Sequence, residues 1–279
     1  AAFDAINQNF SHYSPVPGFL ELRKAIVNKL KRDNNLEYKP TQICVANGAK
    51  QNIFNVLAAL VNEGDEVILP APYWVSYDEM VKINGGVSVF IETNIDTEFK
   101  MTAEQLEAAI TPKTKAVLYS SPCNPSGSYY TREELEKIAN VMAKYPDVVI
   151  ISDEIYEFIN YDGEHVSIAE FPQVFNQTAV INGMSKAFAM TGWRIGYSAC
   201  PEWLADACDK LQGQVTSGAN TVAQRASIVG LETDPKDYYY MVESFEKRRN
   251  LVYELLKEVP GFKVNLPKAA FYFFPDISY

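Results

Sequence analysis

Histidine and cysteine are scarce in this 279-residue sequence, which contains two histidines and four cysteines. His12 and His165 do not have the spacing of a metal site or of a catalytic triad. The cysteines are scattered and form no Cys-x-x-Cys pair: Cys44, Cys123, Cys200 and Cys208. We therefore expect no bound metal, and free buried thiols in a reducing compartment.

The sequence also lacks an apolar run of the ~20 residues that a membrane-spanning helix needs. Its opening residues have neither a basic start nor an apolar core, so a signal peptide is not expected. The formal net charge of −10 disfavours nucleic acid and anionic membranes as partners. We expect a cytoplasmic protein that binds small molecules.

Strand-like and helix-like segments alternate through residues 42–199. This order predicts an α/β fold, with a mostly parallel sheet and helices on both of its faces. Residues 148–152 form an apolar run that predicts a strand buried on both faces. A long helix is predicted over residues 235–259, and we expect its aromatic stripe to serve packing. A plain nucleotide-binding domain is disfavoured, because no G-x-G-x-x-G or Walker-type motif is present.

Lys186 lies among small and apolar residues, in a loop between two predicted strands. No acidic residue occurs between Glu170 and Glu202, so we expect its amine to be poorly hydrated and without a carboxylate partner. Both conditions favour the neutral amine that a Schiff-base lysine needs. Arg194 follows eight residues later and could bind a phosphate bidentately. The alternative is a lysine at the rim of the sheet with its charge in solvent.

Two further segments place polar side chains at the ends of predicted strands. Asp153 and Tyr156 follow the buried strand, at the edge where open α/β sheets bind ligands. A buried carboxylate at that place is costly unless a cation meets it. Asn124 lies in the Ser-Pro-Cys-Asn-Pro-Ser-Gly segment at residues 121–127, whose prolines and glycine fix the backbone. Turn chemistry alone would also explain that composition.

A turn and two aromatic residues are further candidates. Gly48, Ala49 and Lys50 open a predicted helix, whose first N–H groups can bind an anion. Trp74 follows a strand and could stack on a flat heteroaromatic ring, although a place in the core is the more usual role. Tyr13 lies in a loop with two prolines and a glycine, where a surface role is equally open.

Residues 185–197 read Ser-Lys-Ala-Phe-Ala-Met-Thr-Gly-Trp-Arg-Ile-Gly-Tyr. With the Asn124 and Asp153 segments before them, they resemble fold-type I pyridoxal-phosphate enzymes, specifically class I aminotransferases of the aspartate aminotransferase group. The resemblance extends over nearly the whole chain. It implies a mostly parallel seven-stranded sheet in a large domain, the beginning of a smaller α+β domain, pyridoxal 5′-phosphate as cofactor, and a homodimer.

The resemblance also implies roles for the site residues. Lys186 would bind the cofactor covalently and move the substrate proton. Asp153 would keep the ring nitrogen protonated, and Asn124 and Tyr156 would contact the ring oxygen. The cofactor phosphate would be held by residues of the turn and of the lysine loop: Gly48, Ala49, Lys50, Ser185 and Arg194.

Three more roles follow from the same resemblance. Trp74 would stack on the cofactor ring and, together with Asn124, border the substrate. Lys50 would bind the distal carboxylate of an acidic substrate. Tyr13 would cross a dimer interface to the cofactor phosphate of the partner subunit.

The expected organisation has three parts. Residues 1–18 would end a helix and form an interface loop, residues 19–255 would form the cofactor domain, and residues 256–279 would begin the smaller domain. Strands are expected at residues 262–264 and 269–274. The family binds the substrate α-carboxylate through an arginine near its C-terminus, and these residues do not include that segment. We therefore expect a fragment that is shortened at both ends.

The expected reaction is transamination between an acidic amino acid, L-aspartate in the first place, and 2-oxoglutarate. Prephenate, aromatic or broad-specificity aminotransferases and C–S lyases use the same apparatus and stay open. A cofactor-binding module without turnover is a further alternative. For these 279 residues alone we expect little or no transaminase activity.

Overall fold

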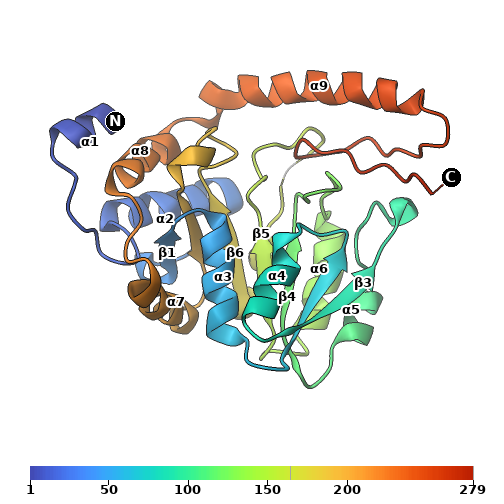
Figure 1. Ribbon diagram of the computed structural model, residues 1–279, viewed down its shortest axis with the longest axis horizontal. Coiled ribbons are helices and arrows are strands. Elements are labelled where there is room, and N and C mark those ends of the chain that lie inside the picture. The colour runs from blue at the N-terminus through green and yellow to red at the C-terminus, as the bar shows by residue number, and fades with distance from the viewer. Residues whose placement is uncertain (164, 279) are drawn as a thin grey trace.

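The computed structural model describes residues 1–163 and 165–278, so the last residue of the expected segment 256–279 lies outside them. One seven-stranded sheet forms the centre, in the order β1-β7-β6-β5-β4-β2-β3 (Figure 1). All neighbouring strands are parallel except that β7 runs antiparallel to both β1 and β6. The strands are β1 (Ile43–Ala46), β2 (Glu66–Ala71), β3 (Val87–Glu92), β4 (Thr114–Ser120), β5 (Val149–Asp153), β6 (Thr178–Gly183) and β7 (Gly196–Ala199).

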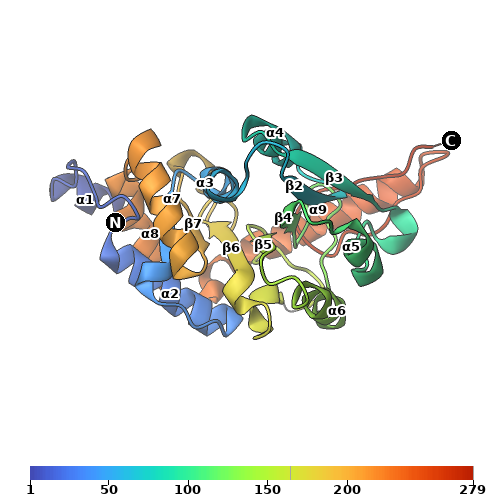
Figure 2. The ribbon, with the colours of Figure 1, turned by 90° about the horizontal axis from the view of Figure 1, so that it is seen from below.

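The central strands are buried on both faces because helices cover both sides of the sheet (Figure 2). One face packs against α3 (Ala49–Leu60), α4 (Ser76–Ile83) and α7 (Glu202–Val215). The opposite face packs against α2 (Leu20–Asn34), α5 (Ala103–Ala109), α6 (Arg132–Met142) and α8 (Thr221–Glu232). The predicted α/β fold with a mostly parallel, helix-flanked sheet is confirmed.

Local sequence signals account for several of these boundaries. The hydroxyls of Thr102 and Thr131 cap α5 and α6 by accepting hydrogen bonds from the N–H groups of Gln105 and Glu134. The Val/Ile run of β5 needs no alternation because neither of its faces meets water. Capping and burial therefore place these elements where the sequence predicts them.

The carboxyl edge of the sheet collects the chain segments that carry the candidate residues. β4 ends at Ser120 and β5 ends at Asp153, and these two residues are paired in register. β6 leads from the same edge into the lysine loop, and β7 returns from that loop in the opposite direction. The candidate site therefore lies where the parallel strands end, as in other open α/β sheets.

The C-terminal part differs from the prediction. The expected long helix is a short 3-10 turn followed by α9 (Tyr239–Lys257), which lies across the body of the molecule (Figure 1). The chain then turns back beneath α9. The strands expected at residues 262–264 and 269–274 are not formed there, because this segment makes only isolated bridges, one from Lys263 to Asp276 and one from Asn160 to Ala269.

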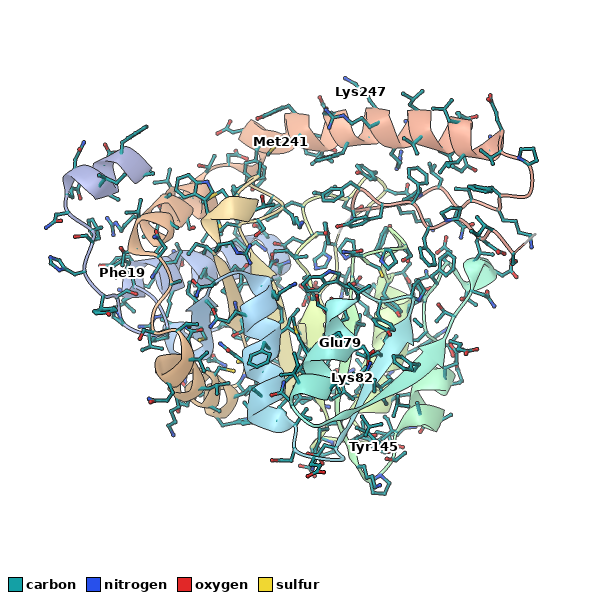
Figure 3. The ribbon with its side chains drawn as sticks, in the orientation of Figure 1. Phe19, Glu79, Lys82, Tyr145, Met241 and Lys247 are labelled. Carbon is teal, nitrogen blue, oxygen red and sulfur yellow. The ribbon has the colours of Figure 1, made fainter. Side chains whose placement is uncertain are left out.

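The aromatic stripe of α9 packs only in part. Phe245 stacks on Phe271, with ring centres 5.1 Å apart. Tyr239 and Tyr240 are exposed, and Val242 is the only fully buried residue of the helix. Figure 3 shows Lys247 on the outer side of α9, pointing away from the sheet. The expectation that the whole stripe serves packing is therefore wrong.

The N-terminal residues form α1 (Ala2–Asn7) and an extended arm that leads to α2. Within residues 1–163 and 165–278, no helix has both the length and the apolar character that crossing a membrane requires.

Candidate active site

A cavity of about 340 Å³ opens at the carboxyl edge of the sheet. Most of the predicted site residues line it, although they come from segments far apart in the sequence: Ala49, Lys50, Trp74, Asn124, Asp153, Tyr156, Ser185, Lys186 and Arg194. Gly48 lies directly behind this lining, against the guanidinium of Arg194. The fold therefore brings the lysine loop, the Asn124 segment, the end of β5 and the start of α3 to one place.

Lys186 lies between β6 and β7 and is half buried. Its Nζ lies 5.4 Å from the ring centre of Tyr156 and 5.5 Å from that of Phe271. Burial lowers the pKa of Lys186, Asp153 opposes this shift, and the charge of Arg194 adds to it. The fold brings Asp153 near enough to raise this pKa by its charge, an influence that the local sequence around Lys186 does not predict. The net pKa shift is still downward and favours a neutral, nucleophilic amine.

Asp153 ends β5 and is only 4% exposed. Its Oδ2 accepts a hydrogen bond of 2.7 Å from the hydroxyl of Tyr77, and its Oδ1 accepts one of 3.3 Å from the N–H of Ile155. Burial raises the pKa of Asp153 to about 6 in spite of these hydrogen bonds. Because both donors are neutral, the ionised carboxylate is left without full compensation and would favour a cationic ligand group.

Two tyrosines and an asparagine meet on another side of the cavity. The hydroxyls of Tyr156 and Tyr272 are hydrogen-bonded to each other, and Asn124 Nδ2 donates a 3.3 Å hydrogen bond to the Tyr272 hydroxyl. Burial raises the pKa of Tyr156 well above its usual value, so the hydroxyl keeps its proton and can donate it in a hydrogen bond. The three side chains form a neutral donor cluster that suits a ligand oxygen.

The turn from β1 into α3 forms the polar floor of the cavity. Ala49 and Lys50 lie in the first turn of α3, so their N–H groups have no acceptor within the helix. Arg194 Nη2 donates a 3.0 Å hydrogen bond to the carbonyl of Asn47, which holds the guanidinium against this turn. A Cβ on Gly48 would lie 2.4 Å from that nitrogen. Gly48 also has a φ of +88°, which strains other residues, so glycine suits both this backbone conformation and the close approach of the guanidinium to the helix start.

Gly196 offers a direct test of this close packing. A Cβ at this position would lie 2.2 Å from the backbone nitrogen of Ala49, which cannot rotate away as a side chain would. We expect Gly196→Ala to cost about 1–3 kcal/mol of unfolding free energy and to weaken phosphate binding, because the turn must shift. Chemical denaturation and inorganic phosphate titration measure the two effects. Gly192→Ala is the matched control, since its Cβ would meet nothing within 4 Å.

Trp74 and Lys50 form the remaining side of the cavity. The Nζ of Lys50 lies 4.6 Å from the centre of the Trp74 ring, and the lysine side chain is exposed. The Trp74 ring also meets Tyr77 edge-on, at a centre distance of 5.6 Å. The tryptophan therefore presents a flat apolar surface to the cavity, with a cation at its margin.

Some residues that line the cavity were not predicted from the sequence, and one predicted site residue lies outside the cavity. The unpredicted lining residues are Tyr77, Ser120, Ile155, Thr191 and Tyr272. Tyr77 stands three residues after Trp74, in the first turn of α4, whereas nothing local marks Tyr272. Tyr13 does not line the cavity and is 95% exposed on the N-terminal arm.

Known proteins are similar to this chain in both sequence and structure. The family model for aminotransferase class I and II matches residues 1–279. An aspartate aminotransferase of Bacillus sp. (strain YM-2) is 48% identical over all of the chain and 71% of its own length. The chain belongs to the class I and II aminotransferases.

Two further relatives agree with this assignment. A probable aspartate/prephenate aminotransferase of Rhizobium leguminosarum bv. phaseoli is 46% identical over 99% of the chain and 70% of its own length. The crystal structure of an aspartate aminotransferase from Rhizobium meliloti superposes with a TM-score of 0.97 at 42% identity, covering 99% of this chain and 70% of that one. The chain thus spans about 70% of these aminotransferases.

Enzymes of this family use pyridoxal 5′-phosphate, and the residues of the cavity fit that group. An amine with a lowered pKa suits its aldehyde, and a buried, undercompensated carboxylate suits its ring nitrogen. The turn at Gly48 suits a phosphate, because the absence of a Cβ on Gly48 and on Gly196 of β7 lets Arg194 and β7 approach it closely. The neutral hydroxyl and amide cluster suits the ring oxygen.

Proposed function

We propose that the protein transfers the amino group of L-aspartate to 2-oxoglutarate. The observation that carries this proposal is the meeting of Lys186, Asp153 and the Gly48–Lys50 turn in one cavity, with the cation of Lys50 at its margin. A dicarboxylic substrate would place its distal carboxylate near that cation. The name of the Bacillus relative supports the same substrate.

We propose that the residues divide the cofactor contacts as follows. Lys186 would hold the cofactor through its aldehyde group, Asp153 would pair with the ring nitrogen, and Tyr156 and Asn124 would hydrogen-bond the ring oxygen. Trp74 lies against the ring. The phosphate is held by the residues of the turn and of the lysine loop: Gly48, Ala49, Lys50, Ser185 and Arg194. When bound, the cofactor supplies a carbonyl for amine exchange and a ring that accepts the electron pair of the α-carbon.

The chain's own groups move the proton. Because burial and Arg194 lower the pKa of Lys186, a larger share of its Nζ is neutral than in an ordinary lysine, and this nitrogen would take the α-proton from the substrate and deliver it to the cofactor. Tyr156 would keep its hydroxyl proton during the reaction and hold the ring oxygen of the cofactor by a hydrogen bond. Beside a cationic ring nitrogen, Asp153 would stay ionised. The opposite charge would stabilise the carboxylate, which its neutral hydrogen-bond donors do only in part.

The test is an absorbance spectrum after successive additions of pyridoxal 5′-phosphate, L-aspartate and 2-oxoglutarate. A visible band that aspartate bleaches and 2-oxoglutarate restores would establish both half-reactions. A band that does not respond to amino acids would support the alternative of cofactor binding without turnover, the result expected above for these 279 residues tested alone. The absence of any lysine-dependent band in a folded sample would contradict the proposed function.

Lys50 is the proposed specificity residue, and its removal should discriminate between substrates. We expect Lys50→Met to lower kcat/KM for aspartate roughly 10- to 100-fold, the worth of a hydrogen bond to a charged group. Phenylalanine has no distal carboxylate, so its kcat/KM should change little, and it serves as the control within the same variant. Equal losses for both substrates would assign Lys50 to the cofactor phosphate alone.

Prephenate is the second candidate acceptor, because the Rhizobium leguminosarum relative is named for aspartate and prephenate. It is also an oxo acid with a second carboxylate, which Lys50 could meet in the same way. Replacing 2-oxoglutarate by prephenate in the second half-reaction decides between the two acceptors.

We further propose a homodimer in the cytoplasm, with Tyr13 extending to the partner subunit. The support is that Tyr13 is 95% exposed on an extended arm, away from the cavity of its own chain. The four buried free cysteines fit a reducing compartment. The domain division at residues 18 and 255 is likewise a proposal, and its second boundary falls in the last turn of α9.

A further inference from the structure

A second set of charged side chains lies buried behind the end of β5. Glu154 and Glu157 alternate with the site residues Asp153 and Tyr156, and they are only 1% and 6% exposed. Asp153 and Tyr156 line the cavity, whereas neither glutamate does. The same short segment therefore presents its functional side chains to the cavity and two carboxylates to the interior.

Glu157 joins three elements of the fold. It forms an ion pair with Lys29 of α2, which is 1% exposed. It also accepts hydrogen bonds of 2.9 Å from Asn34, at the end of α2, and 2.8 Å from Asn182 of β6. Asn182 lies four residues before Lys186 on the strand that leads into the lysine loop. Glu157 thus connects the segment of Asp153 and Tyr156 to the base of that loop.

The side chain and the backbone of Glu154 are also held by hydrogen bonds. One carboxylate oxygen accepts hydrogen bonds from the hydroxyls of Ser152 at 2.9 Å and Ser167 at 2.7 Å, and the other lies 3.0 Å from Nε2 of His165. The backbone N–H of Glu154 donates a 2.8 Å hydrogen bond to the carbonyl of Ile181. The segment is therefore anchored to β6 through both backbone and side chains.

The ligand atoms of Glu154, Glu157 and His165 lie within 4.8 Å of one another, a spacing that a metal ion could use. The ammonium of Lys29 is already paired with Glu157, however. A divalent cation at this place would lie beside that positive charge and be repelled by it. Burial on its own raises the pKa of Glu157, but the charges of Lys29 and His165 outweigh it and lower the pKa below its usual value. The cluster is therefore an internal ion network with an ionised Glu157.

We propose that Glu157 and Lys29 are positioning residues, which hold the Asp153–Tyr156 segment and the base of the lysine loop in the geometry that binds the cofactor. A buried ion pair contributes little net stability compared with apolar packing, but it fixes the orientation of the groups around it. Small displacements of reacting groups cost large factors in rate and affinity. This inference rests on the aminotransferase chemistry and does not depend on aspartate as the substrate.

The test compares two lysine variants of the protein. Lys29→Met removes the ammonium from Glu157. Lys100→Met is the matched control, because Lys100 is 9% exposed and ion-paired with Glu98 at 2.9 Å and with Glu134 at 2.7 Å, but does not line the cavity. Three quantities are measured: the urea midpoint, the Kd of pyridoxal 5′-phosphate, and the pH midpoint of its visible band.

We expect both variants to lower the urea midpoint, and only Lys29→Met to raise the cofactor Kd, by about tenfold or more, and to shift the pH midpoint. Adding Glu157→Gln to Lys29→Met should recover most of the lost affinity, because no buried charge is then unpaired and the amide oxygen still accepts from Asn182. A Lys29→Met variant with a lowered urea midpoint but wild-type Kd and pH midpoint would show a merely structural role and overturn the proposal.

Asn34→Ala covers the case in which Lys29→Met does not fold. It keeps both charges and removes two hydrogen bonds, the 2.9 Å bond that Asn34 donates to Glu157 and the 2.7 Å bond that it accepts from Lys29, and we expect a smaller rise in Kd, of about threefold. An unchanged Kd and pH midpoint in this variant would overturn the proposal. A wild type without any lysine-dependent band would contradict the proposed function. A wild type with this band, together with variants of unchanged Kd and pH midpoint, would contradict only the positioning role, so the two failures are distinguishable.

Discussion

Replacing Lys186 by alanine should abolish the visible band and lower the rate of both half-reactions by at least ~10²- to 10⁴-fold, the usual worth of a positioned general base. The reason is that the half-buried amine of Lys186 supplies both the covalent attachment and the proton transfer, and its pKa is already lowered for both tasks. No other lysine among the described residues shares this environment, because Lys50, which also lines the cavity, is exposed beside Trp74. Stopped-flow absorbance with aspartate measures the effect.

Lys186→Arg separates the two properties of the side chain. Arginine keeps the positive charge and similar length, but its guanidinium stays protonated at any working pH and cannot act as nucleophile or base. We expect this variant to be as inactive as Lys186→Ala and no more stable than the wild type, because the burial and the Arg194 charge that lower the pKa of Lys186 also disfavour a permanent guanidinium. Activity within tenfold of the wild type in Lys186→Arg would show that only the charge is needed, and would contradict the proposed role.

Replacing Asp153 by asparagine should act on stability and activity in opposite directions. In the cofactor-free protein, burial raises the pKa of Asp153 from 3.8 to about 6. The folded state therefore holds this proton more tightly than the unfolded state does. The contribution of Asp153 to stability falls as pH rises from about 4 to about 6, and above that range the ionised group costs roughly 3 kcal/mol.

Asparagine has no charge to bury and can still accept a hydrogen bond from Tyr77, so Asp153→Asn should stabilise the cofactor-free protein at pH 8 by up to about 3 kcal/mol. At pH 4 the two proteins should differ little, which provides an internal control. Urea denaturation at both pH values measures this. A variant that is no more stable than the wild type at pH 8 would show that the carboxylate is not under strain.

The same substitution should lower transamination by ~10²- to 10³-fold, as expected when one preorganised electrostatic partner of a reacting system is removed. Asparagine cannot pair with a cationic ring nitrogen as a carboxylate does. A stability gain together with an activity loss would show that Asp153 is kept for function at the expense of the fold.

The sequence by itself determined the fold class and most of the candidate residues, because both depend on patterns within short contiguous segments. Alternating strands and helices define a parallel sheet, and its carboxyl edge is where Asp153 and Asn124 had to emerge. Lys186 was identifiable because its segment, together with the Asn124 and Asp153 segments, resembles the class I aminotransferases. These signals act within a few residues of one another, and backbone geometry converts them directly into local structure.

The tertiary structure alone decided which distant groups meet. Tyr272 reaches Asn124 and Tyr156 only because the chain folds back beneath α9, and its own neighbours give no sign of this. The strands expected in that segment are replaced by isolated bridges, because strand formation depends on a partner and not on the β-propensity of one segment.

The burial of Lys29 and Glu157 is a second feature that local sequence does not predict. Both residue types are most often exposed, so their sequence positions predict solvent-facing side chains. They are buried because α2, β5 and β6 converge around them and each charge finds the other. Pairing across a fold depends on the order of strands in the sheet and the faces that helices cover, and local sequence does not determine either.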